Sequence, residues 1–262
     1  MKKIFILVIV LLEIFFYSCE KKSCELIPQP GYYIVGSDEN CYYLPNASGN
    51  ANGTFTDSRD NMVYNWVQIG SQVWMAENLK YLPSVSAPDT GSETTPYYYV
   101  YDYVGTDETE AKTTRNYATY GVLYNWPAAM SGSESSSANP SRVQGVCPTG
   151  WHLSSDAEWA ELIDYLGGES IAGEKLKEVG IIHWIGPNMD ATNETGFTAL
   201  PGGYRYYYSG GFSDLGFNGG WWVATEYDTS TAWYRSMYFE FSNVYSYFLN
   251  KEYGLSVRCV RD

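Results

Sequence analysis

Short stretches of alternating apolar and polar side chains run through most of the chain, which is the pattern of half-buried β-strands. Residues 62–70 and 72–75 carry this pattern around a Gly-Ser turn, so they predict a hairpin. Residues 97–103 are rich in tyrosine and valine, as strands often are. The remaining stretches of this kind are residues 196–200, 204–208, 221–227, 232–241, 244–249 and 255–260. The pattern therefore predicts many short strands joined by turns.

Two segments follow a helical repeat instead. In the first, the apolar residues at helical spacing are Trp159, Leu162, Ile163 and Leu166. Ser155 followed by Glu158 has the pattern of a capping box before them, and Gly167 and Gly168 would end the helix. A second, weaker repeat covers residues 170–179. Two helices packed on short, mostly antiparallel strands place the chain in the α+β class.

The N-terminus has the pattern of a bacterial lipoprotein signal peptide. Lys2 and Lys3 precede an apolar run at residues 4–17, which is short for a membrane span but suits a signal peptide. The run ends at Ser18 and Cys19, and a small residue before a cysteine resembles a lipobox. We therefore expect cleavage after residues 1–18 and acylation of Cys19, which would anchor the chain to a membrane. The alternative is an ordinary secretory signal in which Cys19 joins a disulfide.

The cysteines agree with export to an oxidising compartment. With Cys19 acylated, four cysteines remain, an even number that suits two disulfides in any of three pairings. We favour the pair Cys24 and Cys41, which would staple a short N-terminal segment. We also favour the pair Cys147 and Cys259, which would tie the middle of the main domain to its last strand.

The mature chain has two regions of different composition. Residues 19–53 are rich in proline, glycine and small polar residues, which predicts a linker or a small stapled segment. A hairpin across residues 32–35 and 41–44 is expected within it. Residues 54–262 carry the strand and helix patterns and form the main domain.

Composition and charge exclude several classes of protein. Aromatic residues make up 17% of the chain and charged residues 18%, which is unlike a disordered chain. The net charge of −14 argues against a nucleic-acid partner, which needs a basic surface. The apolar run at the N-terminus is the only long one, which excludes a multi-span membrane protein. We expect an acidic lipoprotein of the outer membrane, exposed at the cell surface.

Patterns that signal catalysis are missing from the sequence. The two histidines, His152 and His183, do not form a His-x-x-x-His pair, and no Cys-x-x-Cys, Gly-x-Ser-x-Gly or phosphate-binding loop is present. We interpret both histidines as hydrogen-bonded structural residues. An enzyme with an unrecognised carboxylate site is the least favoured alternative.

Residues 188–194 contain a run of oxygen-bearing side chains. Asn188, Asp190, Asn193 and Glu194 could ligate Ca²⁺, which takes hard oxygen ligands. Their spacing is not that of an EF-hand, so we favour a solvated turn here. Calcium is the one cofactor that the sequence suggests.

Consecutive aromatic residues stand out in the second half of the chain. They are Tyr206, Tyr207, Tyr208, Trp221 and Trp222. Because neighbours in a strand point to opposite faces of a sheet, they cannot all face one core, and we expect some to be exposed. Exposed tyrosine and tryptophan suit stacking on sugars or contact with a protein. The alternative is a second buried surface or an interdomain contact.

Several segments, in this order along the chain, resemble the Fibrobacter succinogenes major paralogous domain, a family of exported bacterial proteins. They are residues 56–60 (TDSRD), 67–79 (VQIGSQVWMAENL), 120–126 (YGVLYNW), 145–153 (GVCPTGWHL), 155–159 (SDAEW), 196–205 (GFTALPGGYR), 222–226 (WVATE) and 256–262 (SVRCVRD). Each segment alone is weak, but the ordered set is specific and spans most of the mature chain.

The resemblance implies a fold similar to the C-type-lectin-like fold, which formylglycine-generating enzymes share. It also implies the pairing of Cys147 with Cys259. Those enzymes need a reactive cysteine pair, so this pairing argues against their activity. The lectin calcium signatures Glu-Pro-Asn, Gln-Pro-Asp and Trp-Asn-Asp are missing from residues 54–262. The resemblance supplies no catalytic residue.

These patterns together predict an exported, lipid-anchored cell-surface protein with a non-catalytic domain that binds a glycan or a protein. The alternative is a structural or assembly subunit of a surface appendage or complex. Such a subunit would pack aromatic residues or strand edges against a partner chain.

Overall fold

The computed structural model describes residues 32–35, 42–45 and 52–261. The chain divides into two compact units, Met1–Asn46 and Ala47–Asp262. In the first unit, β1 (Tyr32–Val35) and β2 (Tyr42–Pro45) pair antiparallel, which confirms the predicted hairpin. Cys19, Cys24, Cys41 and the expected signal peptide lie outside the described residues.

A five-stranded sheet is built around the predicted hairpin of the second unit. Its order is β3 (Gly53–Thr56), β4 (Val63–Ile69), β5 (Gln72–Met75), β14 (Cys259–Arg261) and β8 (Trp151–Leu153), and all pairs are antiparallel. Ile69 lies opposite Gln72, so β4 and β5 form the expected tight hairpin. The last strand of the chain thus lies between β5 and β8 and joins β8 to the rest of the sheet.

The remaining strands form smaller antiparallel sheets. The largest has the order β11 (Asn218–Glu226), β12 (Thr231–Tyr238) and β13 (Tyr245–Asn250). Two-stranded pairs are formed by β9 (Gly202–Arg205) with β10 (Phe212–Leu215), and by β6 (Tyr98–Tyr99) with β7 (Leu123–Tyr124). Together with the helices, these sheets confirm the α+β class.

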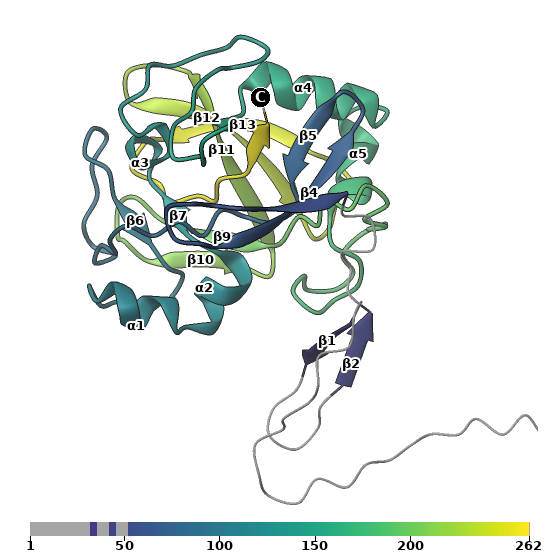
Figure 1. Ribbon diagram of the computed structural model, residues 1–262, viewed down its shortest axis with the longest axis horizontal. Coiled ribbons are helices and arrows are strands. Elements are labelled where there is room, and N and C mark those ends of the chain that lie inside the picture. Colours follow the sequence, from purple (N-terminus) through teal and green to yellow (C-terminus); the bar gives the residue numbers. More distant parts are fainter. Residues whose placement is uncertain (1–31, 36–41, 46–51, 262) are drawn as a thin grey trace, which may run out of the picture. The chain divides into compact units, whose positions relative to one another are not determined.

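Both predicted helices are present. In α4 (Asp156–Tyr165), the Ser155 hydroxyl accepts from the Glu158 N–H while the Glu158 carboxylate accepts from the Ser155 N–H, so the capping box is confirmed. The second helix is α5 (Glu169–Leu176). These two helices lie together on one side of the second unit, away from α1 and α2 (Figure 1).

The expectation of only two helices is wrong. The described residues also contain α1 (Glu108–Lys112), α2 (Arg115–Tyr120) and α3 (Trp126–Met130). Each has five or six residues, too few for an apolar repeat to show in the sequence. Their starts are fixed by the side chains of Asp107, Thr114 and Asn125, which accept hydrogen bonds from the first turn.

Four of the predicted strands are shorter than expected. Residues 204–208 contribute only residues 204 and 205 to β9, and residues 255–260 contribute isolated bridges at Leu255 and Ser256 and the first two residues of β14. Residues 97–103 contribute only Tyr98–Tyr99, and residues 196–200 contribute only an isolated bridge at Ala199. Asp102 and Thr198 have φ values of 60° and 55°, and a left-handed residue interrupts an extended strand. None of the helices among the described residues is long and apolar enough to span a membrane.

The core consists of two large clusters of buried apolar side chains, one on each face of β11. Trp222 and Ala224 belong to one cluster, and Trp221 and Val223 to the other. Successive side chains of a strand point to opposite faces, and here both faces of the strand are covered. The strand β11 is therefore the centre of the second unit.

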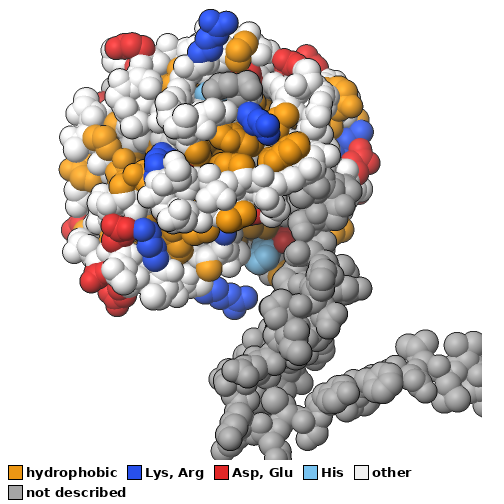
Figure 2. Space-filling view, in the orientation of Figure 1, with side chains coloured by type: hydrophobic (Ala, Val, Ile, Leu, Met, Phe, Trp, Pro, Cys, Tyr) orange, Lys and Arg blue, Asp and Glu red, His pale blue; other side chains and the backbone are white. Residues whose placement is uncertain are grey.

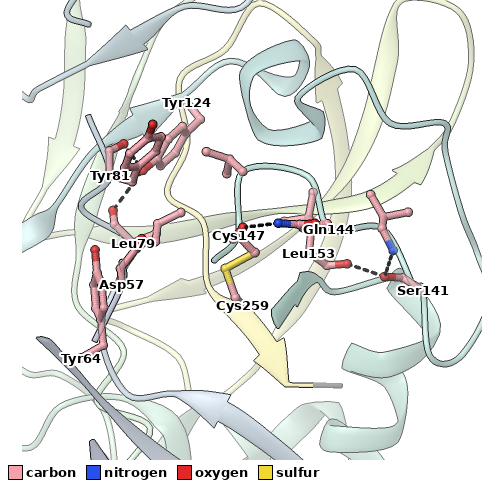
Figure 3. The surroundings of a disulfide bond; sticks show 12 residues. Asp57, Tyr64, Leu79, Tyr81, Tyr124, Ser141, Gln144, Cys147, Leu153 and Cys259 are labelled. Carbon is pink, nitrogen blue, oxygen red and sulfur yellow. Dashed lines mark hydrogen bonds between the residues drawn. A yellow bond between two sulfur atoms is a disulfide. The ribbon is translucent and has the colours of Figure 1, made fainter. Parts of the chain in front are cut away.

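A disulfide joins Cys147 to Cys259 within the first of these clusters (Figure 3). It links the segment before β8 to β14, and both cysteines are fully buried. The Cys147 carbonyl also accepts a hydrogen bond from Gln144 Nε2. The predicted pairing of these two cysteines is confirmed.

Candidate functional site

A buried polar network joins segments that are far apart in the sequence. Asn78 Oδ1 accepts hydrogen bonds from Trp221 Nε1 and from Arg258 Nη2, both at 2.9 Å. Asn78 Nδ2 donates to the Tyr120 carbonyl at 3.0 Å and to Ser256 Oγ at 3.2 Å. One asparagine thus satisfies four groups from three other segments of the chain.

Arg258 is the only charged group in this network. Its guanidinium lies 4.1 Å from the ring centroid of Phe197 and donates to the carbonyls of Phe197 and Thr198. Burial lowers its pKa to about 9, which still leaves it charged at neutral pH. Because these residues are closed off from solvent, the network stabilises the fold and does not contact ligands.

The expectation that Trp221 or Trp222 is exposed is wrong. Both side chains are 0% exposed. A single core on one face of the sheet would leave one of the two tryptophans exposed. β11 instead has a core on each face. Trp222 Nε1 donates to the Tyr124 carbonyl at 2.8 Å, so its polar group is also satisfied inside the protein. These two residues cannot form a surface site in this structure.

Both histidines face carboxylates. His152 Nε2 lies 2.5 Å from Glu158 Oε1, and both residues are buried. His183 Nδ1 lies 2.9 Å from Glu178 Oε1. Glu158 is also part of the capping box. Its one carboxylate therefore contacts His152 and holds the start of α4. These contacts agree with the interpretation of both histidines as structural.

The side chains of the candidate calcium segment have separate protein partners. Asn188 Nδ2 donates to the carbonyls of Glu178 and Gly180, and Asn193 Nδ2 donates to Thr198 Oγ1. Asp190 accepts from Ser242 Oγ, and Glu194 pairs with Lys175. Among the residues that the structure describes, no group of three or more His, Cys, Asp or Glu side chains is placed to hold a metal. The sequence favoured a solvated turn, and the structure exposes Asp190 and Glu194 but buries Asn188 and Asn193.

A shallow depression of about 540 Å³ beside α4 contains two carboxylates, Glu161 and Asp164. Glu161 accepts hydrogen bonds from Ser71 Oγ and from Asn139 Nδ2, and these bonds lower its pKa. A general acid requires the opposite shift. This depression therefore does not support the carboxylate-enzyme alternative.

Tyr206, Tyr207 and Tyr208 are exposed, as expected, with exposed fractions of 37%, 38% and 83%. They follow β9, and the rings of Tyr206 and Tyr207 lie 5.4 and 5.2 Å from that of Tyr253. Tyr204, at 5.8 Å from Tyr253, completes the group. Burial, followed by the phenols of Tyr206, Tyr204 and Tyr207, raises the pKa of Tyr253.

A second group of tyrosines continues this surface over the three-stranded sheet. Tyr234 and Tyr238 share one face of β12, and Tyr245 and Tyr247 lie on the same face of β13. The Tyr245 and Tyr247 rings are nearly parallel, with centroids 5.6 Å apart. Burial raises the pKa of Tyr234, which is only 8% exposed, and the phenols of Tyr238, Tyr247 and Tyr253 raise it further, so the phenols of the two groups lie near one another.

We call these residues together the tyrosine surface. Its members are Tyr204, Tyr206, Tyr207, Tyr208, Tyr234, Tyr238, Tyr245, Tyr247 and Tyr253. Among these members, the sequence analysis chose only Tyr206, Tyr207 and Tyr208 as candidate ligand-binding residues. The spacing of 234 with 238 and of 245 with 247 places each pair on one strand face, and that signal was available. The contribution of Tyr253 depends on the path of a loop and has no sequence signal.

The tyrosine surface has one acidic neighbour, Asp214, whereas Glu252 interacts with the buried cation Arg205. Asp214 lies close enough to Tyr204 to raise the pKa of that phenol after burial, and Glu252 precedes Tyr253. Partial burial also raises the pKa of Asp214. On the face of the molecule in Figure 2, hydrophobic side chains gather in patches, whereas charged side chains are scattered. A surface of flat rings and hydroxyls with an acidic neighbour suits a neutral ligand.

Lys177 is a buried cation that holds three segments together. It is 0% exposed, and its ammonium group donates to the carbonyls of Met189, Tyr238 and Phe241 at 3.0, 3.3 and 2.8 Å. Burial lowers its pKa to about 8 against an ordinary 10.5, although Asp190 and Glu174 oppose the shift. The protonated amine is therefore less favoured in the folded chain than in the unfolded chain.

This shift predicts a rise in stability with pH. Between about pH 8 and pH 10.5 the unfolded chain binds more protons at Lys177, so the free energy of unfolding increases as pH rises. We expect the wild type to gain about 2 kcal/mol relative to Lys177→Met between about pH 7 and about pH 9.5. Urea unfolding of both proteins at several pH values measures this difference. Parallel pH profiles for the two proteins would contradict it.

A model of the Fibrobacter succinogenes major domain matches residues 67–261. No curated protein and no solved structure matches the chain. The match covers more than half of the chain and includes the residues of the Asn78 network, the disulfide and β11. The chain therefore belongs to the Fibrobacter succinogenes major domain family.

Proposed function

We propose that this protein is a lipid-anchored cell-surface protein whose domain binds a neutral glycan, without catalysis, through the tyrosine surface. The observation that carries the proposal is the continuity of that surface across β9, β12, β13 and the loop that holds Tyr253. The N-terminal pattern that ends at Cys19 supports the lipid anchor and the outer-membrane location.

The chemistry of the tyrosine surface favours a sugar. A tyrosine ring offers a flat apolar face to the C–H side of a sugar ring, and its hydroxyl offers hydrogen bonds to sugar hydroxyls. The acidic neighbour Asp214 disfavours an anionic polysaccharide by charge repulsion. A neutral glycan therefore fits better than an acidic one.

We further propose that the domain has a C-type-lectin-like fold. The pairing of Cys147 with the last strand and the packing of two successive helices beside the sheets support this proposal. The proposed binding at the tyrosine surface requires no metal, so EDTA should leave it unchanged.

An assembly subunit of a surface complex is the second candidate. The specific observation that favours it is the open edge of β13, whose backbone groups are described below. Partner binding through that edge would use backbone groups of β13, whereas glycan binding would use tyrosine rings. Tyr245 and Tyr247 lie in both places, so Tyr207 and Tyr208, which are outside β13, are the residues that separate the two roles.

Binding of residues 23–262 to a panel of neutral and acidic glycans tests the proposal, with and without EDTA. This fragment keeps every residue that the structure describes. We expect a neutral glycan to bind, and Tyr207→Ala and Tyr208→Ala each to weaken binding about tenfold through the loss of ring contacts. Tyr165→Ala is the matched control, because Tyr165 is a 66% exposed tyrosine on α4, outside the tyrosine surface.

Two results would overturn the proposal. One is a lack of binding across the panel, after which crosslinking on intact cells would search for a protein partner. The other is binding that Tyr165→Ala weakens as much as the two surface variants do. Loss of binding with EDTA would show instead that a metal takes part.

A further inference from the structure

The strand β13 is an open edge of the three-stranded sheet. Lys251 N–H donates to the Ser230 carbonyl at 2.9 Å, which extends the β12–β13 ladder by one residue pair. Hydrogen-bonded pairs alternate along an antiparallel ladder, so the backbone groups of Tyr245, Tyr247 and Leu249 point toward β12. The N–H and C=O groups of Ser246 and Phe248 therefore point outward.

No backbone group in the described part of the chain pairs with this edge, although Asp156 accepts from Ser246 Oγ and the Tyr227 ring stacks on Phe248. Outside its own sheet, the backbone of Ser246 and Phe248 makes no hydrogen bond with any described residue. The opposite edge of the sheet, β11, is covered: Ser256 N–H donates to the Gly220 carbonyl, and Trp222 N–H donates to the Ser256 carbonyl. The β11 edge of this sheet is thus hydrogen-bonded to another segment, whereas the β13 edge is not.

The edge also lacks the usual protection against pairing. Proteins guard open edges with lysine, proline, inward-pointing charges or bulges. The sequence of β13 is YSYFLN, which contains no charge and no proline, and its pairing with β12 is regular. Tyr247 and Phe248 are 44% and 47% exposed at its centre. An uncharged, aromatic, regular edge is suited to receive another strand.

We propose that β13 pairs antiparallel with β13 of a second copy of this chain, about a two-fold axis at Tyr247. This register places Ser246 opposite the partner's Phe248, and Phe248 opposite the partner's Ser246. Each of these pairs exchanges both of its backbone hydrogen bonds, so all four outward groups of each copy are satisfied. The result is one continuous six-stranded sheet.

The competing two-fold register leaves fewer free backbone groups for pairing between the two copies. If the axis passed through Phe248, Ser246 would lie opposite the partner's Asn250. The Asn250 carbonyl already accepts from Tyr253 N–H, and its side chain donates to Glu93 Oε1 at 2.6 Å. The register at Tyr247 avoids this loop, and it opposes only uncharged side chains: Tyr247 with the partner's Tyr247, and Tyr245 with the partner's Leu249.

Charge favours this edge as the place where two copies meet. The chain carries a net charge of −14, so two copies repel each other over most of their surfaces. The side chains of β13 are uncharged, and the Asp156 carboxylate that accepts from Ser246 Oγ is paired with Arg235, so this edge adds little to that repulsion. The contact involves only one strand from each copy. Because this interface is small, we expect a weak dimer. Anchoring both copies to one membrane would raise their effective concentration.

The pairing would also extend the tyrosine surface. Tyr245 and Tyr247 lie on the same face as Tyr234 and Tyr238, so the two copies would present their tyrosines on one side of the joined sheet. The pairing of β13 with β13 does not depend on glycan binding. It depends on the open edge and on the register.

Sedimentation equilibrium of residues 23–262 at concentrations up to about 1 mM tests the proposal. We expect the wild type to dimerise, and more strongly at about 0.5 M than at about 0.05 M salt because the salt screens the net charge. Tyr247→Lys and Tyr247→Glu should each raise the dimer Kd about tenfold, because like charges face each other at the axis. An equimolar mixture of the two variants should restore the association.

The mixing experiment is specific to this two-fold axis. Tyr165→Lys is the matched control, and it should leave the Kd unchanged. Amide exchange gives a second measurement, since the amides of Ser246 and Phe248 should become protected as concentration rises. A wild type that stays monomeric at about 1 mM overturns the proposal, and so does a charge-swapped mixture that fails to associate.

Discussion

Replacing Asn78 with leucine is expected to lower the free energy of unfolding by about 5 kcal/mol, a large part of the stability of a single domain. The volume is nearly kept, but the Trp221 indole N–H loses its acceptor and the buried Arg258 guanidinium loses one of its partners. The Tyr120 carbonyl and Ser256 Oγ lose their donor. Each unsatisfied buried group costs about 1–3 kcal/mol, and more beside a charge.

Urea unfolding followed by tryptophan fluorescence measures this loss. Asn116→Leu is the matched control, because Asn116 is half-buried and its side chain makes one hydrogen bond, to the Tyr101 carbonyl. We expect the control to cost about 1 kcal/mol. Equal losses for the two variants would show that the Asn78 network adds nothing beyond a single hydrogen bond.

The Asn78 network also explains where the family resemblance comes from. Asn78, Phe197 and Arg258 each lie in a segment that resembles the family, and Trp221 directly precedes another. These segments meet in the interior of the protein because they satisfy one another's polar groups. In this they differ from the tyrosine surface. The resemblance therefore identifies a scaffold, and of the tyrosine surface only Tyr204 lies in one of these segments.

Local patterns predicted the elements whose signals are short-range. The capping box of Ser155 and Glu158 fixed the start of α4, and the alternation around Gly70 predicted β4 and β5. These elements are set by hydrogen bonds and side-chain periods within a few residues. The three short helices carry caps but no period, so only their start residues could have been noticed.

Burial of Trp221 and Trp222 could not be predicted from the sequence in this way. The pair alternates as any strand does, and whether one face or both are covered depends on which distant segments pack there. The tyrosine surface has the same origin, since Tyr253 joins Tyr207 through a loop path that no local pattern encodes. Tertiary packing decides which aromatic residues are core and which are surface.

The second large effect is expected from the Cys147–Cys259 disulfide. Replacing both cysteines with alanine should lower the free energy of unfolding by about 5 kcal/mol, because the bond closes a loop between residues 112 positions apart and restricts the unfolded chain. Denaturant unfolding of the oxidised wild type and the double variant measures the difference. Reductant should then shift the wild type toward the double variant and leave the double variant itself unchanged.

The single variants separate the cross-link from the packing of the two cysteines. Cys147→Ala alone and Cys259→Ala alone already break the bond, so each should cost nearly as much as the double variant. If the cysteines stabilised the fold only as buried apolar residues, the two single losses would instead add up to the double loss. The disulfide ties β14 into the sheet beside β5 and β8, and Arg258 precedes Cys259. A loss well above 5 kcal/mol would therefore show that the bond also holds the Asn78 network in place.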